Sequence, residues 1–115
     1  MKVIKRDGRT IEFDRNKIEV AIQKANNEVR GKEKATNEQI NEIISYIEDL
    51  GKKRILVEDI QDIIEEKLME VGKFELAKKY IVYRYTRALV RKANTTDESI
   101  LGLLRNENKE LAEEN

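Results

Sequence analysis

The 115-residue chain contains no cysteine and no histidine. It therefore lacks a disulfide framework, the usual zinc ligands, a thiol nucleophile and the commonest general base near neutral pH. Carboxylate and lysine chemistry remain, but the missing groups argue against an enzyme. We expect neither catalytic residues nor a protein-bound metal site in this sequence.

The chain also has no proline, no stretch rich in glycine and serine, and no apolar run approaching the roughly 18 to 20 residues of a membrane span. No secretory leader is visible at its start. Its length suits one modest hydrophobic core rather than two. We expect a soluble, cytoplasmic protein with one domain, a tail and no membrane partner.

An excess of charge of one sign is missing as well, because 23 basic residues balance 23 acidic ones. The whole molecule therefore has no general need for an anionic partner such as DNA. The charges are nevertheless sorted by segment. Residues 78–92 contain six basic residues and no acid, whereas residues 58–66 contain five acids and no base.

The stretch VIKRDGRTIEFDRNKI, residues 3–18, predicts a β-hairpin followed by a helix. Asp7-Gly8 is a favoured pair for a two-residue type I′ turn, since both central positions need a positive φ. This turn sets Ile4 opposite Ile11 and Arg6 opposite Arg9, with Val3 opposite Glu12 and Lys5 opposite Thr10.

Apolar residues at helical spacing predict four helices after the hairpin. The first follows the N-cap Asp14 and stops at Gly31, and the second follows a capping box at Thr36 and stops at Gly51. The third and fourth span about 57–72 and 73–92. Because an isolated hairpin is marginal in water, we expect it to pack on the helices. The predicted fold is mainly α, of the α+β class: a two-stranded hairpin on a four-helix bundle.

A change of composition after Asn94 predicts a domain boundary there. Thr95-Thr96-Asp97-Glu98 resembles another capping box and begins a short helix, and the polar residues after it have little to bury. We expect a domain over residues 1–94 and a linker over 95–115.

Phosphate binding would have to use side-chain cations, because the sequence has neither a P-loop nor a dinucleotide fingerprint. Lys5, Arg6 and Lys17 are candidates, and Lys17 lies in the first turn of a helix, where an anion is favoured. Arg84 and Arg87 lie on one side of the fourth helix. The structural alternative for Lys5, Arg6 and Lys17 is a solvated surface charge. For the arginines of the fourth helix it is ion pairing with the acids of the third helix, Asp59, Asp62 and Glu66.

Two segments, VIKRDGRTIEFDRNKI and LAKKYIVYRYTRALVRKA, resemble the ATP-cone, a regulatory nucleotide-binding domain of many ribonucleotide reductases. The resemblance covers residues 2–93. The continuation TTDESILGLLRNENKELAEEN resembles the linker into the catalytic barrel of anaerobic, glycyl-radical ribonucleoside-triphosphate reductases. The chain lacks the four-cysteine zinc ribbon of the cone-bearing transcriptional repressors.

The resemblance implies an allosteric site that binds ATP as activator or dATP as inhibitor, with Mg2+ accompanying the nucleotide. Regulation would act on the catalytic domain of the same reductase, often through a nucleotide-dependent homo-oligomer. Catalysis in that family needs a thiyl radical, so a chain without cysteine would be a regulatory fragment and not the catalyst.

The resemblance also assigns roles to residues of this sequence. Phe13 and Ile18 would sandwich adenine, and Glu12 and the Val3 backbone would read its edge. Lys5, Arg6, Lys17, Arg84 and Arg87 would hold phosphates, and Asp14 would lie beside the nucleotide. Val57 and Gln61 stand where some relatives carry a hydroxyl and a histidine.

Two functions from other classes remain open. A nucleic-acid-binding helical module would use the arginines of the fourth helix, and its affinity would fall steeply with salt. A protein-interaction domain would use the leucine-bearing segment after Asn94.

Overall fold

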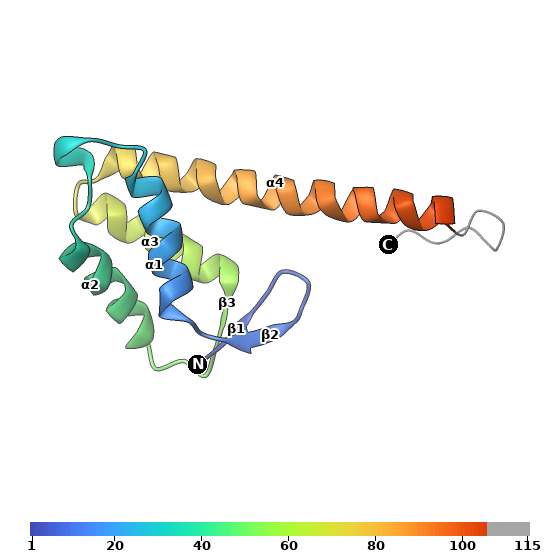
Figure 1. Cartoon of the computed structure of the whole chain (residues 1–115). Coiled ribbons are helices and arrows are strands. Elements are labelled where there is room, and N and C mark those ends of the chain that lie inside the picture. The colour runs from blue at the N-terminus through green and yellow to red at the C-terminus, as the bar shows by residue number, and fades with distance from the viewer. Residues whose placement is uncertain (106–115) are drawn as a thin grey trace. The chain divides into compact units, whose positions relative to one another are not determined.

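The computed structural model describes the backbone of residues 1–105 and the side chains of residues 1–93. Four α-helices and a small sheet make it mainly helical, which confirms the predicted α+β class (Figure 1). The elements in chain order are β1 (Lys2–Ile4), β2 (Thr10–Glu12), α1 (Arg15–Asn26), the 3-10 helix η1 (Gly31–Glu33), α2 (Asn37–Glu48), β3 (Arg54–Leu56), α3 (Val57–Glu70) and α4 (Phe74–Arg105). The chain forms two compact units, of which the first comprises Met1–Tyr83 and the second begins at Arg84.

The sheet has one strand more than predicted. Its order is β2-β1-β3, and β1 pairs antiparallel with β2 and parallel with β3. The first strand of the chain is therefore the central strand of the sheet. Val3 lies between Ile11 and Ile55, and both Val3 and Ile55 are buried.

The hairpin register differs by one residue from the predicted one. Val3 faces Ile11, Ile4 faces Thr10, and Lys2 faces Glu12. The turn is longer than two residues, because the Lys5 N–H donates to the Arg9 carbonyl at 2.7 Å and the Gly8 N–H donates to the Lys5 carbonyl at 3.0 Å. Gly8 has a φ of 89°, so only one loop residue takes the positive φ that a type I′ turn requires of two. One added loop residue exchanges the two faces of a strand.

Side-chain caps begin the first two helices where the sequence predicts them. The Asp14 carboxylate accepts the Asn16 N–H at 3.0 Å, and Thr36 forms a complete capping box with Gln39. α1 ends at Asn26, before the predicted stop at Gly31, and the buried Val29 belongs to the connection that follows it.

Helix α4 runs without a break to Arg105, so the prediction that a separate short helix begins at Thr95–Glu98 is wrong. A capping box begins a helix only where the chain enters it from an extended conformation. Here the preceding residues are already helical and contain neither glycine nor proline. The predicted polar tail at 106–115 lies outside the described residues, and the boundary at residue 94 stays a prediction.

One hydrophobic core unites the sheet, the first three helices and the beginning of α4. Its largest fully buried side chains are Ile22, Ile40, Ile44, Ile47, Ile64, Leu68 and Leu76. Ala77 and Tyr80 are the last described core residues along the chain. In residues 1–105, no helix combines the length and apolar character needed to cross a membrane.

Candidate functional site

The ends of two parallel strands bring together several of the predicted site residues. Ile4 pairs with Leu56, so Lys5 leaves β1 beside the point where Val57 begins α3. Lys5 and Val57 are half-buried, and Val57 packs against the core. The sheet thus positions a cation from the hairpin next to the N-terminus of a helix, where partial positive charge is concentrated.

Arg6 lies in the β1–β2 loop and forms an ion pair with Glu58 in the first turn of α3. The Arg6 Nε and Glu58 Oε2 atoms are 3.3 Å apart. This pair is not predictable from the sequence, because Arg6 and Glu58 are far apart in the chain and come close only through the parallel pairing of β1 with β3. The contact places the hairpin loop directly over the beginning of α3.

Gln61 follows Glu58 after almost one turn of α3, and its Oε1 atom is buried with no hydrogen-bond donor among the residues whose side chains the structure describes. A buried polar atom normally has a partner, so this oxygen is a candidate acceptor for a ligand group. Gln61 was among the residues expected to contact a nucleotide. Lys5, Arg6, Val57 and Gln61 therefore lie around the same junction of sheet and helix.

The other end of the short sheet carries Glu12. Its carboxylate pairs with the Lys2 ammonium on the neighbouring strand, and this hydrogen bond lowers the Glu12 pKa below its ordinary value. Each strand has three residues, about 10 Å of chain. The residue predicted to contact the base, Glu12, and the predicted phosphate contacts, Lys5 and Arg6, therefore lie toward opposite ends of the sheet.

The connection from β2 to α1 and the beginning of α1 contain four more of the predicted residues. Phe13 and Ile18 are half-buried and pack against the core, so only part of each side chain is available to a ligand. Asp14 uses one carboxylate oxygen as the N-cap of α1, and Lys17 is exposed in the first turn.

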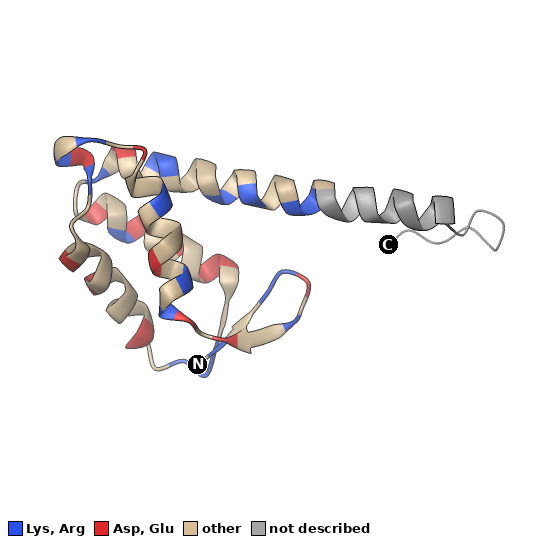
Figure 2. Ribbon diagram, viewed as in Figure 1, with Lys and Arg blue, Asp and Glu red and all other residues tan. Residues whose placement is uncertain are grey.

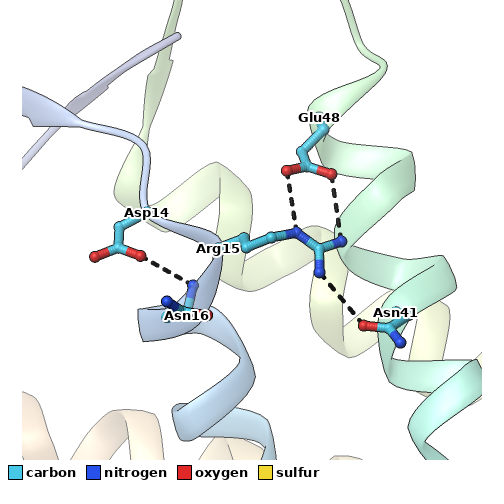
Figure 3. Close-up of polar contacts among 5 residues, drawn as sticks. All are labelled: Asp14, Arg15, Asn16, Asn41 and Glu48. Carbon is cyan, nitrogen blue, oxygen red and sulfur yellow. Dashed lines mark hydrogen bonds and ion pairs between the residues drawn. The ribbon is translucent and has the colours of Figure 1, made fainter.

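Arg15, which the sequence did not single out, has a structural role beside these residues. Its guanidinium donates to both carboxylate oxygens of Glu48 at 3.2 and 3.4 Å, and to the Asn41 side-chain oxygen at 3.4 Å (Figure 3). These bonds tie the start of α1 to α2. A bidentate guanidinium–carboxylate pair fixes geometry well, so Arg15 orients the helix that carries Lys17.

The basic residues of α4 form a series along its described part, with no acid from Lys78 to Lys92 (Figure 2). Arg84 is half-buried and Arg87 is exposed. Both belong to the second compact unit. Their predicted contact with phosphate stays a prediction.

No group of three or more acidic side chains capable of holding a metal ion occurs within the described part of the chain. The sheet therefore brings together Lys5, Arg6, the first turn of α3 and Gln61, whereas Lys17 follows the other end of the sheet, where β2 ends at Glu12. These residues are a candidate site, in a small α+β domain, for a phosphorylated ligand that also donates hydrogen bonds.

Comparison with known proteins identifies the family. Residues 1–89 match the ATP cone domain, so the chain belongs to the ATP-cone family. It is 38% identical over 115 residues to the anaerobic ribonucleoside-triphosphate reductase of Haemophilus influenzae, covering 98% of this chain and 16% of that protein. ATP-cone domains bind adenine nucleotides as allosteric ligands.

Reductases of other types are similar too. The alpha subunit of the ribonucleoside-diphosphate reductase of Chlamydia muridarum is 37% identical, covering 87% of this chain and 11% of that protein. The vitamin B12-dependent reductase of Thermoplasma acidophilum is 38% identical, covering 78% of this chain and 12% of that protein. The chain spans about one sixth of these relatives or less.

Proposed function

We propose that this chain is the regulatory nucleotide-binding domain of a ribonucleotide reductase, with ATP as activator and dATP as inhibitor. The match of residues 1–89 to the ATP-cone family carries the proposal. The catalytic domain of the reductase would be its partner, and we expect a cytoplasmic location. Similarity over 98% of the chain favours an anaerobic ribonucleoside-triphosphate reductase.

The described site is compatible with a nucleoside triphosphate. Lys5 and Arg6 supply cations at one end of the sheet, and the first turn of α3 adds the partial charge of a helix N-terminus. Within the described side chains, the Gln61 Oε1 atom has no hydrogen-bond donor. A ribose hydroxyl would supply the missing donor, and Mg2+ would bind the phosphate oxygens as a hard cation.

Discrimination between ATP and dATP depends on one 2′-hydroxyl. A hydrogen bond gained or lost there is worth about 1 to 3 kcal/mol. Regulation further requires that the two ligands stabilise different arrangements of the reductase, because equal affinity for both arrangements shifts nothing. A nucleotide-dependent homo-oligomer is one such arrangement.

Calorimetric titration with ATP, dATP and GTP, each with Mg2+ at physiological salt, tests the proposal. We expect saturable binding of ATP and dATP, weaker binding of GTP, and no hydrolysis. If none of the three nucleotides binds, a protein-interaction domain becomes the better reading. Binding of duplex DNA with a steep salt dependence would instead favour a nucleic-acid-binding module.

A double variant, Lys5→Ala with Arg87→Ala, tests the site. Each lost charge-assisted contact costs about 1.5 to 3 kcal/mol, so we expect the affinity for ATP to fall more than a hundredfold. The helical circular dichroism signal should change little. Lys32→Ala is the control, because this exposed lysine lies in η1, which is not part of the proposed site. Unchanged affinity in the double variant would refute the site.

A further inference from the structure

The ion pair between Arg6 and Glu58 joins two parts of the candidate site. Arg6 lies in the loop between β1 and β2, and Glu58 is the second residue of α3. The two side chains are 40% and 53% exposed, so water reaches both charges. The guanidinium expected to bind phosphate therefore already has an anion beside it within the same chain.

The position of Glu58 on its helix favours the carboxylate. The N-cap residue of α3, Leu56, has no side chain able to accept a hydrogen bond from the first turn, and Glu58 and Asp59 are the acids of that turn. A negative charge there is stabilised by the unsatisfied N–H groups of the helix. Glu58 thus occupies an electrostatic environment that also suits a phosphate.

Exchange of one anion for the other is energetically feasible. An exposed ion pair is weak, because water solvates both partners and the side chains lose freedom when they pair. A phosphate group accepts two parallel hydrogen bonds from a guanidinium and carries more negative charge than a carboxylate. A bound phosphate would therefore displace Glu58 from Arg6, and the two anions would repel each other if both stayed close.

We propose that Glu58 is an internal competitor for the phosphates of the nucleotide, holding the hairpin loop on α3 until a phosphate replaces it on Arg6. This inference rests on the proposed function. It makes Glu58 a positioning residue that weakens nucleotide binding and does so more strongly as the number of phosphates increases. The hairpin loop exchanges an internal anion for an external one when ligand binds.

Glu58→Gln tests the proposal, with affinities for ATP, ADP and AMP measured by calorimetry on the full chain. We expect ATP to bind about three- to tenfold more tightly than to the unsubstituted chain. The gain should be smaller for ADP and absent for AMP. Glu66→Gln is the control, because it removes the same charge eight residues further along α3, about 12 Å along the helix. Its effect should stay below twofold.

A double-mutant cycle that combines Glu58→Gln with Arg6→Gln tests whether Glu58 affects nucleotide binding through Arg6. If Glu58 acts through Arg6, most of the gain should disappear in the Arg6→Gln background. Unchanged affinity in Glu58→Gln, or an equal loss for all three nucleotides, would overturn the inference and leave Glu58 as a structural support for the loop. Failure of the unsubstituted chain to bind ATP would instead overturn the proposed function.

Discussion

At the scale of single residues, Asn26 shows how a polar side chain fixes a connection inside the core. It is 6% exposed, and its amide forms two bonds with one residue: Nδ2 donates to the Ala35 carbonyl at 3.0 Å and Oδ1 accepts the Ala35 N–H at 2.9 Å. These bonds close the loop that leads from α1 to α2. The sequence pattern predicted the buried faces of both helices but not the hydrogen bonds between Asn26 and Ala35. A single asparagine at the end of a helix and a single alanine in a loop give no periodic pattern or charge from which such a contact could be predicted.

Replacement of Asn26 by alanine should destabilise the protein. It would leave the N–H and carbonyl of Ala35 without the partners they have now, and each buried unsatisfied group costs about 1 to 3 kcal/mol. We expect a loss of about 2 to 4 kcal/mol in the free energy of unfolding, measured in urea. Asn27→Ala removes the exposed neighbouring side chain and should change stability by less than about 0.5 kcal/mol. Similar losses in both variants would contradict the role of Asn26.

At the scale of elements, the hairpin and the starts of the helices were predictable, whereas the third strand, the hairpin register and the ends of α1 and α4 were not. Caps such as Asp14 and Thr36 act on their own first turn, so the local sequence contains all that determines them. Strand β3 has three residues and follows two lysines, so nothing local distinguishes it from a loop. The hairpin register depended on one loop residue, and a change of one residue reassigns every side chain to the opposite face.

The candidate site divides in the same way. Its candidate cations can be named from the sequence because charge is visible there, and the first-turn position of Lys17 follows from the cap before it. The Glu58 partner of Arg6 and the unsatisfied Gln61 oxygen were not found, since both depend on where β3 pairs. Contacts between segments that are distant in the sequence can be identified only once the fold is known.

Acid should loosen the hairpin loop. The Arg9 N–H donates to Asp7 Oδ1 at 3.0 Å and Arg9 Nε donates to Oδ2 at 2.8 Å, and the backbone hydrogen bond contributes most to lowering the Asp7 pKa. A carboxyl whose folded pKa is below its unfolded value stabilises the fold above the unfolded pKa. That stabilisation is lost as the pH falls from about 4 through the folded pKa.

The amide proton shift of Arg9, followed by NMR, should therefore titrate with a midpoint below that of an unstructured aspartate. Asp7→Asn keeps an acceptor oxygen without a titrating group and should abolish this transition. The amide of Ile44, in the core of α2, should show no transition over the same range. A midpoint at or above the ordinary aspartate value would refute the assignment.

At the scale of the whole molecule, the described core ends well before the described helix does. The buried side chains of the described residues run from Val3 to Tyr80, whereas five large apolar side chains between Tyr80 and residue 93 are more than a third exposed: Ile81, Val82, Tyr85, Leu89 and Val90. A partner domain would find these residues accessible. None of these five side chains belongs to the buried core.

A fragment of residues 1–93 should consequently fold like the 115-residue chain. We expect the two midpoints of thermal unfolding to differ by less than about 4 °C, equivalent to less than about 1 kcal/mol for a domain of this size. A fragment of residues 1–75 removes Leu76, Ala77 and Tyr80 from the core and should not fold cooperatively. A large loss in the longer fragment would show that residues 94–115 support the domain.

The central position of β1 also determines when the candidate site can form during folding. β1 pairs with a strand about 50 residues later in the chain, and helices α1 and α2 lie between them. Helices with local contacts form quickly, but pairing across such a separation must wait for the intervening chain to compact. During synthesis, the hairpin therefore leaves the ribosome before β3 and completes its sheet only after β3 has emerged. The central strand of the sheet is made early and reaches its final structure late.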